Sequence, residues 1–301
     1  MRFSIWPSTQ QPWSDILEVT RYAESTGWDG VYVADHFMGS GDAGGGPTTP
    51  THEATAVMAA LAEATERVRI GSLVFSVTFR HPAVLAKWAA SVDHVSDGRL
   101  LLGIGAGWQP NEHDQYGIEL GSLRTRIERF EEACEVLVGL LRHDATNVGG
   151  QHYVVSDAIA EPKPVQRPLP LLIGCKGDRM IGIAARYADV WNAWGRADTI
   201  ADRMALLDDR CAAIGRDPAS IERSCQALWF LTDDIARAEE MVSRSPMAAI
   251  AGPPERLADA VAAWREAGVD EVIVPDFTLG QGRERLDRMD VILNEVAAAF
   301  R

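Results

Sequence analysis

Short apolar runs alternate with longer amphipathic stretches along the whole chain, and this alternation limits the possible folds more than any other feature. Eight apolar runs can be counted, and after each one apolar residues recur every three or four positions. Alternating strands and helices predict a parallel sheet, and eight such units in 301 residues suit a closed barrel. We therefore predict an α/β fold, a (β/α)8 TIM barrel that forms one domain over residues 1–301.

Several of the runs are continuously apolar, as expected for strands covered by helices on one side and by a packed interior on the other. The expected strands are residues 3–6, 31–34, 68–75, 100–104, 168–173, 189–193, 226–231 and 271–274. The expected helices are residues 13–26, 53–65, 84–95, 127–141, 180–187, 200–214, 236–242, 254–267 and 286–300. Residues 39–51, rich in Gly, Pro and Thr, form either a lid or an ordinary surface loop.

The charge balance restricts the partners of this chain. Lys and Arg total 29 against 43 Asp and Glu, a net charge of −14. Such a surface repels nucleic acid and anionic membranes, so we expect a small-molecule partner, with no nucleic acid and no membrane. The four cysteines lack C-x-x-C spacing, and no converging His or carboxylate set predicts a metal site. The chain shows no signal-peptide core or membrane-length apolar run, which predicts a cytoplasmic protein.

In barrels of this kind the functional side chains lie at the C-terminal ends of the strands. The second expected strand ends in Ala-Asp-His-Phe, which places Asp35 and His36 there. An imidazole titrates near neutral pH, which suits proton donation or a hydrogen bond to a cofactor ring. A structural histidine packed against the rim is an equally good interpretation of His36.

A glycine-rich turn, GIGAGWQPNE, follows the fourth expected strand from residue 103. It differs from the dinucleotide-binding fingerprint, because Trp108 occupies the sixth position and Pro110 follows where a helix should open. The glycines indicate clearance for a flat group near the backbone, or alternatively a tight turn that requires glycine. The candidate ligand contacts in this turn are Ala106, Gly107, Trp108, Asn111 and Glu112.

The fifth expected strand is followed by a Gly-Cys-Lys-Gly-Asp-Arg segment that opens a helix. Small residues, a lysine and a helix N-terminus favour a phosphate site, and an ordinary helix start with Asp178 as N-cap is the alternative. The candidate contacts are Gly174, Cys175, Lys176, Gly177, Asp178 and Arg179. Tryptophans near strand ends could also wall a planar cofactor, although core packing is the commoner role for any one of them. These are Trp6, Trp108, Trp191 and Trp194.

Four blocks of sequence, taken together, resemble one known family. The longest spans residues 70–108 and reads IGSLVFSVTFRHPAVLAKWAASVDHVSDGRLLLGIGAGW. The others are VYVADHF (31–37), EPKPVQRPLPLLIGCKG (161–177) and AARYADVWN (184–192). In this order they resemble the luciferase-like flavin and deazaflavin oxidoreductases over nearly the whole chain. The resemblance implies a barrel whose mouth holds a flavin-type ring, and the compact length favours the subgroup that uses coenzyme F420.

The resemblance also assigns roles to individual residues. It implies a non-proline cis peptide at Leu73–Val74 with the ring against it, and places Ala106, Gly107, Trp108 and Trp194 near the ring. Polar contacts to the cofactor would come from Asp35, His36, Asn111 and Glu112. Residues 174–179 would seat the phosphate, and His36 would be the proton donor or the residue that polarises the ring.

One departure from the family pattern bears on the substrate. The F420-dependent sugar-phosphate dehydrogenases share a histidine at the position of His36, but they carry a catalytic Glu where this chain has Trp108. The loss of that Glu argues against sugar-phosphate oxidation and favours a bulky, apolar substrate.

The resemblance implies hydride transfer between the deazaflavin and a small organic substrate, with a homodimer as the assembly. The alternatives are an FMN-dependent monooxygenase on the same fold and a non-catalytic flavin-binding barrel.

Overall fold

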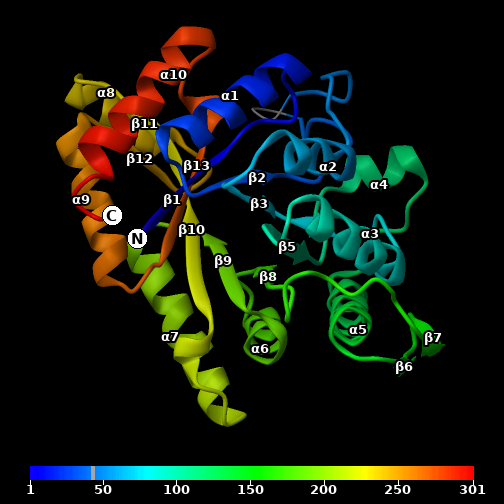
Figure 1. The fold of residues 1–301 in the computed structure, drawn as a ribbon. Coiled ribbons are helices and arrows are strands. Elements are labelled where there is room, and N and C mark those ends of the chain that lie inside the picture. Colours follow the sequence, from blue (N-terminus) through cyan, green and yellow to red (C-terminus); the bar gives the residue numbers. More distant parts are fainter. Residues whose placement is uncertain (42–44) are drawn as a thin grey trace. The chain divides into compact units, whose positions relative to one another are not determined.

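The computed structural model describes residues 1–41 and 45–301; residues 42–44, within the expected loop 39–51, lie outside the described residues. The main sheet has the strand order β3-β2-β1-β13-β10-β9-β8-β5-β4. Figure 1 labels each of these strands except β4. A further pairing of β3 with β5 joins the two ends of this order, so the sheet closes on itself. Because β3 and β4 are two pieces of the third expected strand, eight strands close the sheet, and the (β/α)8 fold is confirmed.

The strands of the main sheet are β1 (Arg2–Trp6), β2 (Gly30–Val33), β3 (Arg69–Ser72), β4 (Phe75–Ser76), β5 (Leu100–Gly105), β8 (Leu171–Gly174), β9 (Val190–Trp194), β10 (Glu222–Gln226) and β13 (Glu271–Pro275). The α-helices are α1 (Trp13–Thr26), α2 (Ala54–Ala64), α3 (Pro82–Val95), α4 (Pro110–Tyr116), α5 (Leu123–Arg142), α6 (Asp178–Tyr187), α7 (Ala197–Ala213), α8 (Ile235–Arg244), α9 (Pro254–Glu266) and α10 (Gly282–Val291). A π-helical turn, η4 (Ile292–Val296), continues α10, and short 3-10 turns lie at η2 (Pro218–Ser220) and η3 (Asp276–Thr278). In the described ranges, no helix is long and apolar enough to cross a lipid bilayer.

The contacts divide the chain into two compact units, which we describe separately. Unit 1 consists of residues 1–8, 12–32 and 175–301. Unit 2 consists of residues 9–11 and 33–174.

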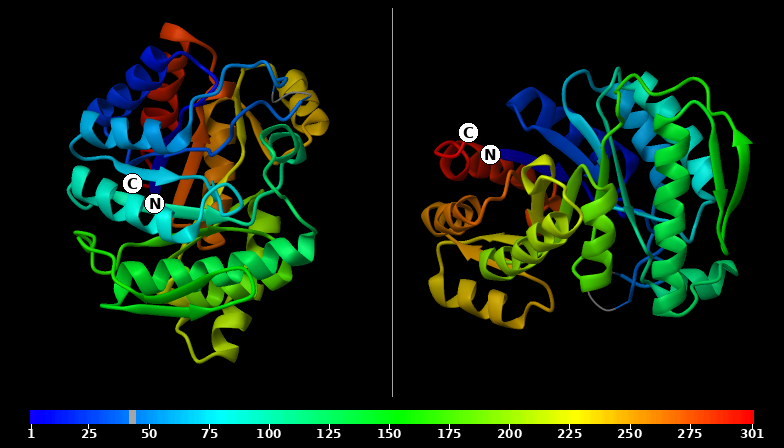
Figure 2. Two further views of the ribbon diagram at one scale, coloured as in Figure 1. Left: turned by 90° about the vertical axis from the view of Figure 1, so that its right-hand side faces the viewer. Right: turned by 90° about the horizontal axis from the view of Figure 1, so that it is seen from below.

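Unit 2 contains an antiparallel hairpin that the sequence did not predict. Its strands β6 (Thr146–Gly149) and β7 (Val154–Ala158) lie alongside α5, as Figure 2 shows from two sides. The hairpin loop is held by Glu132 of α5, whose carboxylate accepts hydrogen bonds from the backbone N–H groups of Gln151, His152 and Tyr153. Burial acts to raise the pKa of Glu132, but these three donors outweigh it and hold the pKa below its ordinary value. The strands escaped prediction because most of β7 is exposed and carries no apolar periodicity.

In unit 1 the seventh strand of the barrel lies earlier in the chain than we predicted. The expected strand 226–231 is wrong as a barrel strand: β10 ends at Gln226, and β11 (Leu228–Leu231) pairs instead with β12 (Ala249–Gly252) in a separate parallel sheet. The true strand begins with two charged residues, which hide it from an apolar-run search. Both are paired, Glu222 with Arg2 at 2.5 Å and Arg223 with Asp208 at 2.6 Å.

Helix α4 corrects our interpretation of the glycine-rich turn. We took Pro110 as evidence against a helix at this point, but α4 begins at this residue. Proline is favourable at the first helical position, because its missing N–H would have no partner there in any case. The helix ends at Gly117, which adopts a left-handed conformation.

Strand β5 approaches β3 so closely that residue 103 must be glycine. The Ser72 hydroxyl bonds to both the N–H and the C=O of Gly103 at 2.8 Å. A Cβ added at residue 103 would lie 1.9 Å from the backbone oxygen of Ser72, well inside van der Waals contact. The two strands could accommodate a side chain here only by moving apart.

We therefore expect Gly103→Ala to destabilise the protein by about 1–3 kcal/mol or more, because the clash is with backbone rather than with a flexible side chain. Gly182→Ala is the matched control. Gly182 lies within α6, and a Cβ there would meet no described atom within 4 Å, so this change should stabilise the protein by up to about 1 kcal/mol. Urea unfolding of the three proteins tests both values, and equal midpoints would contradict the proposed clash.

Candidate active site

The third strand is interrupted between β3 and β4, where the chain forms a cis peptide at Leu73–Val74, as the family resemblance predicted. Leu73 is buried and Val74 is half-buried. The Val74 methyls are surrounded by glycines: an added Cβ would lie 3.2 Å from them at Gly103, 2.7 Å at Gly105 and 3.1 Å at Gly174. The glycines therefore provide clearance for Val74 itself, which corrects our inference that they leave room directly for a flat ligand.

Gly107 makes room for a chain of polar groups. It has φ +80, and a Cβ there would lie 2.6 Å from Ser76 Oγ. Ser76 Oγ lies 2.6 Å from Thr78 Oγ1, which lies 2.7 Å from His113 Nε2, and His113 Nδ1 lies 2.7 Å from the carbonyl oxygen of Gln109. A carbonyl only accepts, so in the neutral ring Nδ1 donates to it and Nε2 accepts from Thr78. Thr78 in turn accepts from Ser76, so all the hydrogen bonds in this series run in one direction, from Ser76 to the Gln109 carbonyl.

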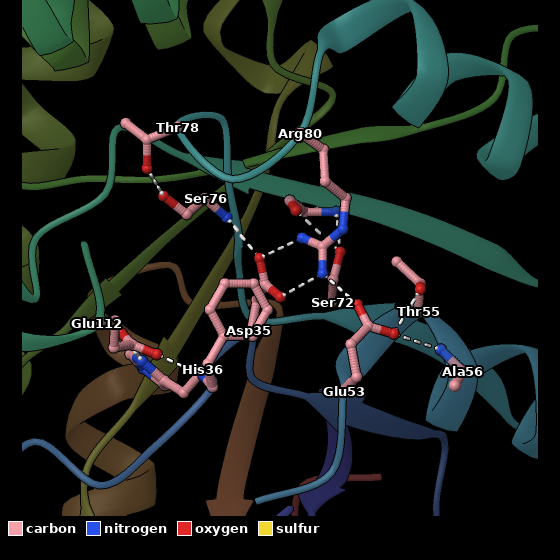
Figure 3. A network of polar contacts seen from close by, with 12 residues as sticks. Asp35, His36, Glu53, Thr55, Ala56, Ser72, Ser76, Thr78, Arg80 and Glu112 are labelled. Atoms are coloured by element: carbon pink, nitrogen blue, oxygen red, sulfur yellow. Dashed lines mark hydrogen bonds and ion pairs between the residues drawn. The ribbon is translucent and has the colours of Figure 1, made fainter. Parts of the chain in front are cut away.

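An ion pair between the buried Asp35 and the half-buried Arg80 holds the end of β2 to the loop after β4 (Figure 3). Arg80 donates to both oxygens of Asp35 at 2.7 and 2.9 Å, and the Ser76 N–H donates to the same carboxylate at 3.0 Å. Arg80 also pairs with Glu53, the N-cap of α2. Burial raises the pKa of Asp35, and the guanidinium and the N–H act against that rise. The sequence suggested Asp35 as a cofactor contact but did not predict this pairing or the part taken by Glu53.

Arg80 and Glu53 both keep their charges in this arrangement. Burial acts to lower the pKa of Arg80, but the Asp35 and Glu53 carboxylates outweigh it and raise the pKa. Burial also acts to raise the pKa of Glu53, but the Thr55 hydroxyl, the Ala56 N–H and Arg80 together lower it.

His36, the candidate catalytic residue, lies beside Glu112 of α4 (Figure 3). Its Nδ1 is 2.9 Å from Glu112 Oε1, and the other oxygen of Glu112 accepts the N–H of Phe37. Glu112 is 0% exposed, so its oxygens are engaged within the protein rather than open to a cofactor. The His36 and Trp108 rings also lie nearly perpendicular to each other, with centroids 5.6 Å apart, and Trp108 is 61% exposed.

Asn111 retains an unused hydrogen-bond acceptor. Its amide nitrogen donates to the Gly39 carbonyl at 2.9 Å, while its Oδ1 is buried and has no partner within residues 1–41 and 45–301. A buried polar atom without a partner is unfavourable, unless a ligand supplies the missing donor. This atom is consistent with our prediction that Asn111 contacts a ligand.

In unit 1 the segment after β8 opens α6, as predicted, but the N-cap differs. The helix begins at Asp178, so Gly177 is the N-cap, and among the described residues no side chain caps this end. The alternative interpretation of Asp178 as N-cap is therefore wrong; its carboxylate pairs with Arg203 at 3.0 Å.

Burial raises the pKa of the Cys175 thiol to about 12, so this thiol is protonated at neutral pH and is a poor nucleophile.

Lys176 and Arg196 line a cavity of about 320 Å³ in unit 1. Neither has an ion-pair partner in the described part of the chain. The other walls come from Trp194, from the start of α7 and from the segment between α8 and β12, including Met247. Two unpaired cations beside apolar walls make this cavity suitable for an anionic group.

The predicted tryptophans take different positions. In unit 1, Trp6 makes edge contacts with Trp194 and with Phe277, with ring centroids 5.8 and 5.4 Å apart. Trp191 is fully buried and donates to the Cys175 carbonyl at 3.0 Å, so it belongs to the core rather than to a ligand wall.

The chain forms a closed parallel barrel with a cis peptide at Leu73–Val74, as the family resemblance implied. The sequence profile of the luciferase-like monooxygenase family matches residues 1–250, and the chain belongs to this family.

Two relatives and one solved structure illustrate what the chain is similar to. The F420-dependent glucose-6-phosphate dehydrogenase of Amycolatopsis mediterranei (strain U-32) is 36% identical over 176 residues, which are 58% of this chain and only 51% of the relative. An uncharacterized protein of Mycobacterium tuberculosis (strain CDC 1551 / Oshkosh) is 31% identical over 69% of this chain and 72% of its own length. An F420-dependent secondary alcohol dehydrogenase, solved with an F420-acetone adduct, has a TM-score of 0.86 at 21% identity. It covers 100% of this chain and 99% of its own, and at this identity it shows the fold alone.

The lowered pKa of Glu53 predicts how acid affects stability. A group whose pKa falls on folding stabilises the protein above its unfolded value, here 4.5, and this contribution disappears as the pH falls through the lower folded value. Glu53→Gln should therefore reduce the free energy of unfolding at pH 7 by less than about 1 kcal/mol, since the side chain is 39% exposed. The difference from the parent should shrink as the pH falls below 4.5.

Chemical unfolding at pH 7 and pH 3 measures this difference, with Glu63→Gln, an exposed change on the same helix α2, as the control. If Glu53→Gln and Glu63→Gln respond alike at both pH values, Glu53 makes no pH-dependent contribution to stability.

Proposed function

We propose that this protein is an F420-dependent oxidoreductase that transfers a hydride between the deazaflavin coenzyme and a small organic substrate. The observation that carries the proposal is the similarity to F420-dependent glucose-6-phosphate dehydrogenases, at 36% identity in the Amycolatopsis relative. The placement of His36 beside the buried Glu112 supports it further.

The residues present in unit 2 fit such a coenzyme. The half-buried Val74 presents an apolar surface, and the buried Oδ1 of Asn111 lacks a donor that a ligand N–H or O–H could supply. We propose that the ring is held by His36, Leu73, Val74, Ala106, Gly107, Trp108 and Asn111. The carboxylate of Asp35 is bound by Arg80 and by the Ser76 N–H, so Asp35 holds this segment in place. When bound, the deazaflavin supplies the hydride chemistry, and the protein supplies orientation and a suitable electrostatic environment.

In unit 1 the cavity beside Lys176 is the proposed site for an anionic group such as a phosphate or carboxylate. The segment Gly174 to Arg179, with the N-terminus of α6, is the predicted phosphate seat, and Trp194 lines the same cavity as Lys176. On a chain with a net charge of −14, unpaired cations at this place favour binding of an anion rather than a general attraction to polyanions.

The chain's own contribution to the chemistry is a proton at His36. Nδ1 faces the buried Glu112 carboxylate, so Nε2 is the nitrogen that exchanges a proton with the substrate. Trp108 stands beside this ring with most of its surface exposed, where the sugar-phosphate dehydrogenases that the chain resembles carry a catalytic Glu. An indole at this position provides apolar contact and no carboxylate, which supports a bulky, apolar substrate over a sugar phosphate.

An FMN-dependent monooxygenase is the second candidate, favoured by the description of the family itself. It would consume oxygen and bind FMN in preference to F420. The finer assignments of a homodimer and a cytoplasmic location rest on the family resemblance and the composition, and we propose them on that basis alone.

Titration with F420 and, in parallel, with FMN distinguishes the two candidates. Because Trp108 and Trp194 belong to the proposed sites, F420 should quench tryptophan fluorescence at micromolar concentrations, and FMN should cause little change. The reverse preference would assign the protein to the FMN monooxygenases. Binding of neither cofactor would contradict a flavin-type site altogether.

Replacing His36 should separate chemistry from binding. We expect His36→Ala to lower turnover at least about 100-fold while changing the F420 dissociation constant less than about 3-fold, because general acid–base groups contribute on this scale. His143→Ala, at an exposed histidine after α5, is the control and should change neither value. Unchanged turnover in His36→Ala would remove this residue from the mechanism.

A further inference from the structure

The first turn of α4 is bound to the segment after β2, residue by residue. Glu112 bonds to His36 and to the N–H of Phe37. The side-chain amide of Gln109 donates to the Met38 carbonyl at 3.2 Å, and Asn111 donates to the next carbonyl, that of Gly39. Residues 36–39 are therefore all held from one helix end, and Glu112 is the only one of the three side chains that contacts the imidazole.

The hydrogen atoms in this arrangement can be assigned from chemistry. The Phe37 N–H can only donate, so Glu112 Oε2 accepts it. An ionised carboxylate has no proton to give, so Oε1 also accepts, and His36 Nδ1 must carry the hydrogen. In the neutral ring, Nε2 then has a free lone pair. The side chain of His36 is 28% exposed and that of Glu112 only 1%, so a ligand can reach the imidazole but not the carboxylate.

We propose that Glu112 is a positioning residue that fixes the tautomer of His36, with the hydrogen on Nδ1 and Nε2 free to accept a proton. The catalytic role of His36 in this inference rests on the proposed function, whereas the assignment of its tautomer rests only on the contacts with Glu112. When Nε2 takes the proton, an Nε2–H bond forms as the O–H or N–H bond of the substrate breaks. The resulting imidazolium then faces the Glu112 carboxylate, which balances its charge.

Glu112 could instead serve only to anchor the loop, and Glu112→Gln separates these two roles. The amide oxygen of the substituted side chain can still accept the Phe37 N–H, so the anchor is kept. Its NH2 group then faces His36 Nδ1 and can only donate. Nδ1 must become an acceptor, the hydrogen moves to Nε2, and the nitrogen that should accept a proton loses its lone pair.

The test is a pair of measurements on the full-length protein. With 15N-labelled histidine, NMR reports which ring nitrogen carries the hydrogen, and His36→Ala identifies the signals of His36. We expect the Nδ1–H tautomer in the parent and the Nε2–H tautomer in Glu112→Gln, with no coenzyme present. Turnover in Glu112→Gln should fall about 100-fold or more, with F420 affinity within about 3-fold of the parent, as for a tautomer reversal in a catalytic triad.

Asp114→Asn is the matched control, because it removes one carboxylate charge from an exposed position on the same helix. It should change neither the His36 tautomer nor turnover. An Nε2–H tautomer in the parent protein would overturn the proposal, and this measurement does not depend on whether a variant folds. An unchanged tautomer in a folded Glu112→Gln protein would overturn it as well.

The outcomes also separate this inference from the proposed function. A tautomer that reverses in Glu112→Gln, in a parent protein that neither binds F420 nor turns over substrate, supports the positioning role and rejects the F420 assignment. A parent enzyme that uses F420, with a Glu112→Gln variant of unchanged turnover, rejects the positioning role and keeps the F420 assignment.

Discussion

The ion pair between the buried Asp35 and Arg80 is the interaction on which the candidate site depends most. Arg80 lies between β4 and α3, Asp35 follows β2, and Glu53 caps α2, so a single guanidinium holds three segments together. Removing Arg80 would leave the buried Asp35 carboxylate without its counter-charge, at a cost of about 3–5 kcal/mol. With Asp35 fixed, the next residue, His36, has little freedom in where it projects.

Close packing of the backbone acts alongside this ion pair. Glycine at positions 103, 105 and 174 lets the strands approach Val74, and the cis peptide turns the chain at the same point. The glycines in this region are therefore explained by packing of the backbone against Val74. A ligand can contact only the part of Val74 that this packing leaves exposed.

The candidate site has a histidine whose two nitrogens have different surroundings. Glu112 contacts Nδ1 within the protein, and because the ring is partly exposed, Nε2 is available to a ligand. Trp108 next to it contributes apolar area rather than a charge. This combination suits the proposed hydride chemistry, in which one proton must be handled by the protein while the coenzyme carries the electrons.

The sequence by itself determined the fold class, the family and most of the strand ends, because apolar periodicity and the block from residue 70 to residue 108 are local signals. It also pointed to His36 and to the cis peptide position. The tertiary structure alone decided the partners: the burial of Glu112 against His36, the sharing of Arg80, and the shift of the seventh strand to β10. The first two contacts join residues that are 76 and 27 positions apart in the sequence. Strand β10 was missed because it begins with charged residues, whose partners are brought near only by folding. Hydrophobic pattern cannot encode such pairings, since they depend on the distances that folding creates.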